Sequence, residues 1–170
     1  MSETLEHILP EKIECLAHAL LANADRHNLA LATAESCTGG LLAALLTDVE
    51  GLSHVFERGF VTYSDQAKCD LLDIAQSMVD DCGAVSREVA VAMAKGAKER
   101  SRADIAVSIT GFAGPAGEDD EEGLVHFACI DRNGRCVHAE RHFGAIGRNG
   151  VRIAALETAL TMMNNAIPDG

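Results

Sequence analysis

Hydrophobic positions along the chain follow two spacings, one helical and one extended. Leu9, Ile13 and Leu16 recur at intervals of three or four within residues 4–27, which predicts a helix there. Residues 29–34 instead form a short apolar run that is typical of a buried strand. The same patterns predict further helices at 38–47, 67–72, 74–82, 86–100 and 148–165. They predict further strands at 55–63, 103–109, 124–130 and 135–143.

Two local signals define how these elements begin and connect. Ser86 opens SREV and is a favoured helix N-cap, although Val89 replaces the glutamate of a capping box. Residues 131–134 read Asp-Arg-Asn-Gly between two strands, and Asn-Gly is a strong hairpin signal. Helices alternate with strands early, and the hairpin comes late. We therefore expect one α/β domain over residues 1–170, a three-layer α/β/α sandwich with a mixed, mostly parallel β-sheet.

Composition fits a compact domain without a membrane segment. The 170 residues are 48% hydrophobic, which is enough for a sizeable core. No apolar run reaches the ~18 residues that a membrane-spanning helix needs. The start, MSETLEHILPEKIE, is acidic and unlike the basic beginning of a secretory signal. We expect a cytoplasmic protein that has no membrane partner.

The net charge and the cysteine spacing limit the kinds of partner and ligand that we expect. A net charge of −12 repels the phosphates of DNA and RNA, so we expect no nucleic-acid partner. A small anionic ligand stays compatible with this charge, because a local pocket can oppose the overall field. Six cysteines show neither a CxxC pair nor zinc-ligand spacing, so we expect reduced, buried thiols and no metal or cofactor.

The stretch AESCTGG, residues 34–40, carries candidate chemistry. It follows a predicted strand and leads into a predicted helix, where unpaired N–H groups carry partial positive charge. Ser36 would stand beside these groups, and an oxyanion forming next to it could be stabilised there. The alternative is that Ser36 or Thr38 caps the helix and that the two glycines only ease a turn.

A serine nucleophile needs a base, and the sequence offers one unusual candidate. The seven histidines are scattered and form no recognisable triad motif. Of the four lysines, Lys68 follows the end of a predicted strand, five residues after Tyr63, the single tyrosine. If that strand lies beside the Ser36 strand, both side chains could reach the serine, and desolvation would favour a neutral lysine. Spacing alone leaves open that Lys68 is a surface charge and Tyr63 an edge aromatic.

Four motifs together resemble the C-terminal domain of the CinA family, the nicotinamide-nucleotide amidohydrolases. They are AESCTGG (34–40), GFVTYSDQAK (59–68), GAVSREVAVAMAKGA (83–97) and SITGFAGPAG (108–117), in the family's order. The larger CinA proteins carry an additional N-terminal domain, and this chain resembles the stand-alone form. The resemblance implies hydrolysis of the carboxamide of nicotinamide mononucleotide (NMN) to nicotinic acid mononucleotide and ammonia, without a metal. It also implies a homo-oligomer and a small-molecule nucleotide substrate.

The resemblance also implies a role for each motif residue. Ser36 would be the nucleophile, Lys68 its base, and Tyr63 would orient the pair or relay the proton. Further residues would contact the substrate or the oxyanion: Thr38, Gly39, Gly40, Thr110, Gly111, Arg148 and Arg152. The two arginines lie four positions apart, so they share a helix face and suit a phosphate contact. The alternative for them is ordinary solvated arginines on an acidic surface.

Two departures from the family pattern concern the substrate end. Residues 117–123 read GEDDEEG, where the family usually has a glycine-rich stretch and a Lys-Pro-Val-Gly turn. Gly147 stands where the family usually has the aspartate of Gly-Asp-Arg. Five adjacent acids are typical of a solvated loop and lack the alternation of a calcium loop, but beside the pocket they would repel a phosphate. The alternative function is therefore a non-catalytic nucleotide-binding or regulatory module on the same fold.

Overall fold

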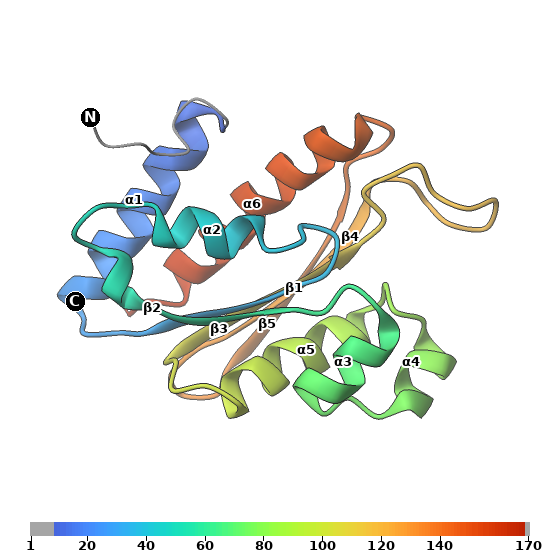
Figure 1. Cartoon of the computed structure of the whole chain (residues 1–170), viewed down its shortest axis with the longest axis horizontal. Coiled ribbons are helices and arrows are strands. Elements are labelled where there is room, and N and C mark those ends of the chain that lie inside the picture. Colours follow the sequence, from blue (N-terminus) through green and yellow to red (C-terminus); the bar gives the residue numbers. More distant parts are fainter. Residues whose placement is uncertain (1–8, 169–170) are drawn as a thin grey trace.

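A computed structural model describes residues 9–168, and its centre is a five-stranded sheet in the order β2-β1-β3-β4-β5 (Figure 1). β1 pairs in parallel with β2 and β3, whereas β4 is antiparallel to β3 and β5. Only β4 therefore runs against the other described strands, which confirms the mixed, mostly parallel sheet. The strands are β1 (Leu31–Glu35), β2 (Phe56–Val61), β3 (Ile105–Gly111), β4 (Leu124–Ile130) and β5 (Cys136–His142).

Helices cover both faces of this sheet, which confirms the three layers (Figure 1). One face carries α1 (Glu11–Arg26), α2 (Leu41–Thr47) and α6 (Gly147–Asn165). The other face carries α3 (Asp65–Leu72), α4 (Gln76–Cys82) and α5 (Arg87–Glu99). A 3-10 turn, Ser53–Val55, leads into β2. No helix between residues 9 and 168 combines the length and the hydropathy needed to cross a bilayer.

Alternation along the strands separates two hydrophobic cores. Leu31 in β1 packs into the cluster that α1 and α6 share, whereas Ala32 and Ala34 face the cluster around α5. β3 follows the same rule, with Val107 in the first cluster and Ala106 in the second. The small residues on the α5 side allow that helix to approach the sheet closely.

Local chemistry accounts for where the elements begin. The Ser86 hydroxyl caps α5 by accepting the Val89 N–H at 3.2 Å, as its position in the sequence predicts. Asp131 Oδ1 accepts the N–H groups of Asn133 and Arg135 at 2.9 Å each and closes the β4–β5 turn. The first helix starts at Glu11 after Pro10, later than predicted, and residues 4–8 of the expected helix lie outside the described residues.

Two sequence expectations need correction. α2 begins at Leu41 and not at 38, because Gly39 and Gly40 adopt left-handed φ values of 61° and 95° that end the preceding turn. The cysteines are unbonded within residues 9–168, but they are not uniformly buried: Cys37 and Cys129 are, whereas Cys15, Cys82 and Cys136 are exposed. The exposed thiols sit on polar helix surfaces or on the edge strand, where the apolar pattern does not extend.

Candidate functional site

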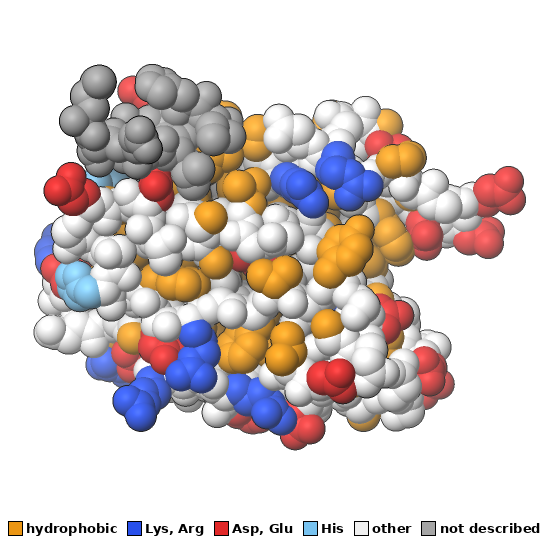
Figure 2. All heavy atoms as spheres, in the orientation of Figure 1, with side chains coloured by type: hydrophobic (Ala, Val, Ile, Leu, Met, Phe, Trp, Pro, Cys, Tyr) orange, Lys and Arg blue, Asp and Glu red, His pale blue; other side chains and the backbone are white. Residues whose placement is uncertain are grey.

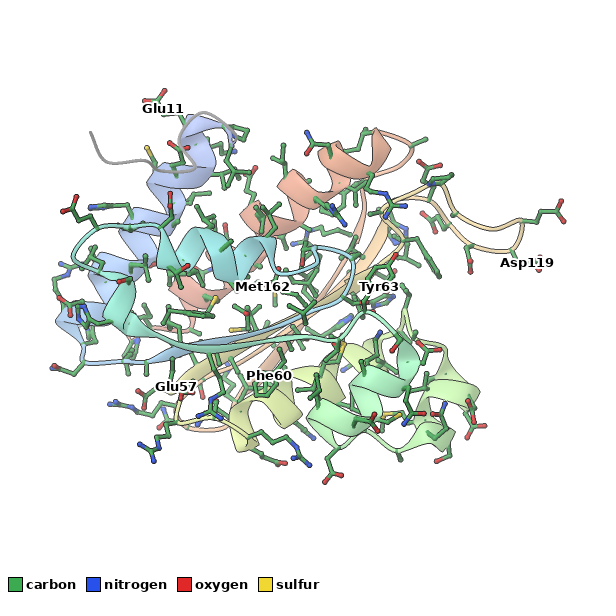
Figure 3. The ribbon with its side chains drawn as sticks, in the orientation of Figure 1. Glu11, Glu57, Phe60, Tyr63, Asp119 and Met162 are labelled. Carbon is green, nitrogen blue, oxygen red and sulfur yellow. The ribbon has the colours of Figure 1, made fainter. Side chains whose placement is uncertain are left out.

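The carboxyl ends of the neighbouring parallel strands β1, β2 and β3 converge on one pocket of ≈ 270 Å³. Ser36 follows β1 directly, Tyr63 and Lys68 follow β2, and Thr110 and Gly111 end β3. Ligands of open α/β sheets bind at this edge. Tyr63 lies just beyond the end of β2 (Figure 3) and lines this pocket. The wall consists of Ser36, Cys37, Tyr63, Asp65, Lys68, Ala84, Val85, Thr110, Gly111, Phe112, Ala113, Gly114, Pro115 and Arg148.

Ser36 and Lys68 meet at the bottom of this pocket. Lys68 Nζ lies 3.3 Å from Ser36 Oγ, within hydrogen-bond reach. The Lys68 side chain is 1% exposed although it is a lysine, and Ser36 is 8% exposed. Nζ also donates to the Thr62 carbonyl at 3.0 Å, which fixes the direction of the amine. The neighbouring strands β1 and β2 thus bring together two residues that are 32 positions apart.

Burial sets the protonation of this amine. It lowers the pKa of Lys68 below its ordinary value, because the ammonium form loses its hydration. Asp65 opposes the shift, since its carboxylate lies 3.9 Å from Nζ, and the thiols Cys37 and Cys69 oppose it less. A lowered pKa increases the fraction of neutral amine, which can accept a proton from the adjacent Ser36 hydroxyl.

Glu35, not Ser36, caps the helix that follows. Its carboxylate accepts the N–H groups of Leu42 at 2.9 Å and Ala43 at 3.0 Å, at the positive end of α2. It also accepts the Thr38 hydroxyl at 2.7 Å. α2 has no side-chain cap from its own N-cap, Gly40. The hydroxyl of Ser36 is therefore not used as a cap and points instead to Lys68.

Three of the predicted contact residues belong to the turn that follows Ser36 but do not line the pocket wall. Thr38 is 2% exposed and its hydroxyl is committed to Glu35. Gly39 and Gly40 form the left-handed part of the turn, and a Cβ at Gly40 would lie 3.2 Å from the Val61 side chain. None of these three side chains or α-carbons lines the described pocket, so a ligand contact by them stays a prediction.

The two arginines of α6 occupy different places. Arg148 is exposed and lines the pocket at its rim. Arg152 is half-buried and does not line the pocket; its Nε donates to the Cys37 carbonyl at 2.8 Å. That bond ties α6 to the turn that carries Ser36. Thr110 and Gly111 do line the pocket, and the Thr110 hydroxyl donates to the Ala84 carbonyl at 2.7 Å.

Asp65 and Glu35 are two residues of the site that the sequence motifs did not single out. Asp65 lies within YSDQAK, and its position three residues before Lys68 on a helix indicates that the two side chains are neighbours. Glu35 gave no comparable signal, because its carboxylate at the end of β1 reaches the start of α2 only when the intervening turn has folded. Among residues 9–168, no group of three or more His, Cys, Asp or Glu side chains is arranged to hold a metal ion.

The acidic loop does not form part of the pocket wall. The segment around residues 117–122 projects from the body, and acidic side chains gather at its tip (Figures 1 and 2). Asp119 lies at the far end of this projection (Figure 3). None of the acids at 118–122 lines the pocket that holds Ser36.

The fold and this site define an α/β protein whose strand-end pocket holds a buried serine–lysine pair. A model of the CinA C-terminal domain matches residues 13–167, and the chain belongs to that family. The competence/damage inducible protein CihA of Agrobacterium tumefaciens has a similar structure, with a TM-score of 0.90 and 46% identity over 93% of this chain and 97% of that one. A CinA superfamily protein of Escherichia coli gives a TM-score of 0.84 at 37% identity, over 96% and 99% of the two chains.

Curated relatives include longer and shorter proteins. A CinA-like protein of Syntrophobacter fumaroxidans is 40% identical over 96% of this chain but only 39% of its own length. The chain thus spans about two fifths of that relative. The nicotinamide-nucleotide amidohydrolase PncC of Enterobacter agglomerans is 45% identical over 75% of this chain and 80% of its own length.

Proposed function

We propose that this chain hydrolyses the carboxamide of NMN to nicotinic acid mononucleotide and ammonia. The observation that carries the proposal is the 3.3 Å separation of Ser36 Oγ from the buried Lys68 amine, at the base of a pocket. The name of the Enterobacter agglomerans relative supports the substrate class. Burying a lysine whose amine hydrogen-bonds a hydroxyl and a carbonyl, with its nearest carboxylate 3.9 Å away, is costly for stability, which favours a chemical role.

The first step of the proposed reaction forms an acyl-enzyme. Neutral Lys68 accepts the Ser36 proton while Ser36 Oγ attacks the carboxamide carbon, giving a tetrahedral intermediate. The Thr62 carbonyl holds one Nζ hydrogen, so the amine lone pair is available toward Ser36. The Lys68 ammonium then gives its proton to the departing nitrogen, and ammonia leaves as the C–N bond breaks.

The second step releases the product. Lys68, again neutral, removes a proton from a water molecule that attacks the ester carbon, and the proton returns to Ser36 as the acyl–oxygen bond breaks. One water is consumed for each ammonia released, and no electrons are transferred. In the described turn, the Gly39 and Leu41 N–H groups bond to Ser36 and Thr38 carbonyls and Glu35 takes those of Leu42 and Ala43. We assign the oxyanion to the backbone amide of Cys37, a residue of the pocket wall, with that of Thr38 next to it.

Substrate contacts follow from the remaining pocket residues. Arg148 at the rim suits the phosphate, since a guanidinium binds phosphate oxygens in pairs. Thr110 and Gly111 form the part of the wall at the end of β3, where a side chain at position 111 would collide with the Leu124 carbonyl and Val125. Tyr63 faces the same pocket and would orient the ring or the proton transfer.

The deciding experiment measures ammonia and nicotinic acid mononucleotide from purified protein and NMN, with a chelator present. We expect release by the native protein and its loss in both Ser36→Ala and Lys68→Ala. Ser77→Ala and Lys95→Ala, at exposed positions outside the pocket, are the matched controls and should keep full activity. Full activity of Ser36→Ala would refute the nucleophile assignment.

The alternative, a nucleotide-binding or regulatory module, is motivated by the acidic segment 118–122. It predicts calorimetric binding of NMN by the native protein without any product. Because these acids lie outside the pocket wall, they give it less support than the sequence alone did.

A further inference from the structure

The charges of the pocket wall are unevenly placed. Among the described residues that line it, Asp65 is the single acidic residue, and Lys68 and Arg148 are the two basic residues. Asp65 lies beside Lys68 at the nucleophile end, with its carboxylate 3.9 Å from Nζ. The side chain is 56% exposed, so one side of the carboxylate remains open to the pocket.

Asp65 is not needed as a helix cap. It begins α3, but Ser64 is the N-cap, and its hydroxyl oxygen accepts the Ala67 N–H at 3.1 Å. The Asp65 carboxylate interacts favourably with the positive end of the α3 dipole, as any acid in the first turn would. Its position on the pocket wall is the feature that this ordinary role leaves unexplained.

The reaction changes the balance of charge around Asp65. Lys68 must be neutral to act as a base, and within residues 9–168 Asp65 forms no other ion pair. In the reactive state the carboxylate therefore carries a negative charge that no described side chain compensates. The reacting carboxamide must lie at Ser36, so a positive charge on the ring that bears this amide would enter the same space.

We propose that Asp65, with the aromatic face of Tyr63, recognises the positive charge of the pyridinium ring and so selects oxidised nicotinamide nucleotides. This inference rests on the proposed function. Tyr63 is 65% exposed yet lines the pocket, so its ring is available to stack on or beside a cation (Figure 3). Arg148, at the rim, complements the phosphate, so the pocket suits a ligand that is cationic at its ring and anionic at its end.

The test compares two ligands that differ in ring charge. NMN and its reduced form, NMNH, carry the same amide, ribose and phosphate, but only NMN has a cationic ring. Calorimetry on the Ser36→Ala protein measures both affinities without turnover. We expect NMN to bind several-fold more tightly than NMNH, and Ser36→Ala/Asp65→Asn to reduce that preference to near one, chiefly by weakening NMN about five-fold.

Matched variants separate ring recognition from a change in net charge or fold. Asp70→Asn removes the same charge from α3 outside the pocket and should keep the preference for NMN. Asp65→Glu should restore part of it, and thermal unfolding checks that each variant is folded. An unchanged preference in Asp65→Asn, equal binding of NMN and NMNH by the parent, or no binding of either would overturn the inference. If the native protein released no ammonia from NMN while binding kept its Asp65-dependent preference, the proposed function would fail and the ring recognition would stand.

Discussion

The buried carboxylate of Glu35 allows the sharpest structural prediction, through the substitution Glu35→Gln. The native carboxylate is 1% exposed and accepts three hydrogen bonds, from Thr38 Oγ1, Leu42 N and Ala43 N, at 2.7, 2.9 and 3.0 Å. Glutamine has the same shape but replaces one acceptor oxygen with an NH₂ donor. In either amide orientation at least one N–H or hydroxyl of the turn then faces a donor.

The expected cost follows from these contacts. An unsatisfied buried donor costs about 1–3 kcal/mol. Loss of the negative charge at the N-terminus of α2 adds about 1 kcal/mol. We therefore expect Glu35→Gln to lower the free energy of unfolding by about 2–4 kcal/mol, a large part of the ~5–15 kcal/mol typical of a domain. Because the same turn carries Ser36, kcat for NMN should fall at least tenfold while KM changes little.

Urea unfolding and steady-state kinetics test this prediction together. The urea midpoint should fall with an unchanged slope, since the surface exposed on unfolding is the same. Glu99→Gln, at an exposed position at the end of α5, is the control and should match the native protein in both assays. A Glu35→Gln protein within 0.5 kcal/mol of native stability, with native kcat, would show that the carboxylate does not hold the turn; the 0.5 kcal/mol limit is about the size of an ordinary surface substitution effect.

Three further predictions concern pH, the arginines and the acidic loop. Activity should rise with pH through the lowered pKa of Lys68, because only the neutral amine accepts the Ser36 proton, and Asp65→Asn should move this rise to lower pH since Asp65 holds that pKa up. A rate that shows no rise at any pH below the ordinary pKa of a lysine, or a shift of the rise to higher pH in Asp65→Asn, would contradict this. Arg148→Ala should raise KM for NMN about tenfold with little change in kcat, because Arg148 lines the pocket. Arg152→Ala should lower kcat about three- to tenfold with little change in KM, because it loses the bond to the Cys37 carbonyl. Steady-state kinetics in which Arg148→Ala changed kcat and Arg152→Ala changed KM would reverse the two roles. Replacing the acids at 118–122 with serine should change KM less than about threefold at 0.15 M salt, because they lie outside the pocket wall and exposed charges are screened. A larger change in KM that high salt removes would show that the negative charge of the loop acts on substrate binding.

The sequence was most informative where local physics determines structure. The spacing of Leu9, Ile13 and Leu16, the Ser86 cap and the Asn133-Gly134 turn depend on neighbours within a few residues, and each predicted element is present, with its ends moved by a few positions. The α/β/α layers followed from the order of these elements.

Contacts between residues far apart in the sequence could not be predicted from local patterns. Arg152 bonds the Cys37 carbonyl across 115 positions, a contact that its helical spacing from Arg148 does not reveal. Glu35 caps α2 only because the turn folds its carboxylate back on the helix. The approach of Lys68 to Ser36 was conditional on β2 lying beside β1, which periodicity cannot establish.

The central claim is that Ser36, deprotonated by Lys68, forms a covalent acyl intermediate with the carboxamide carbon of NMN. Its most direct test is peptide mapping by mass spectrometry of protein quenched with acid during turnover. We expect a nicotinyl nucleotide ester on Ser36 that is absent from Lys68→Ala. An adduct on the neighbouring Cys37, whose burial raises the pKa of its thiol to about 11 and so keeps it protonated, or full turnover by Ser36→Ala, would contradict it.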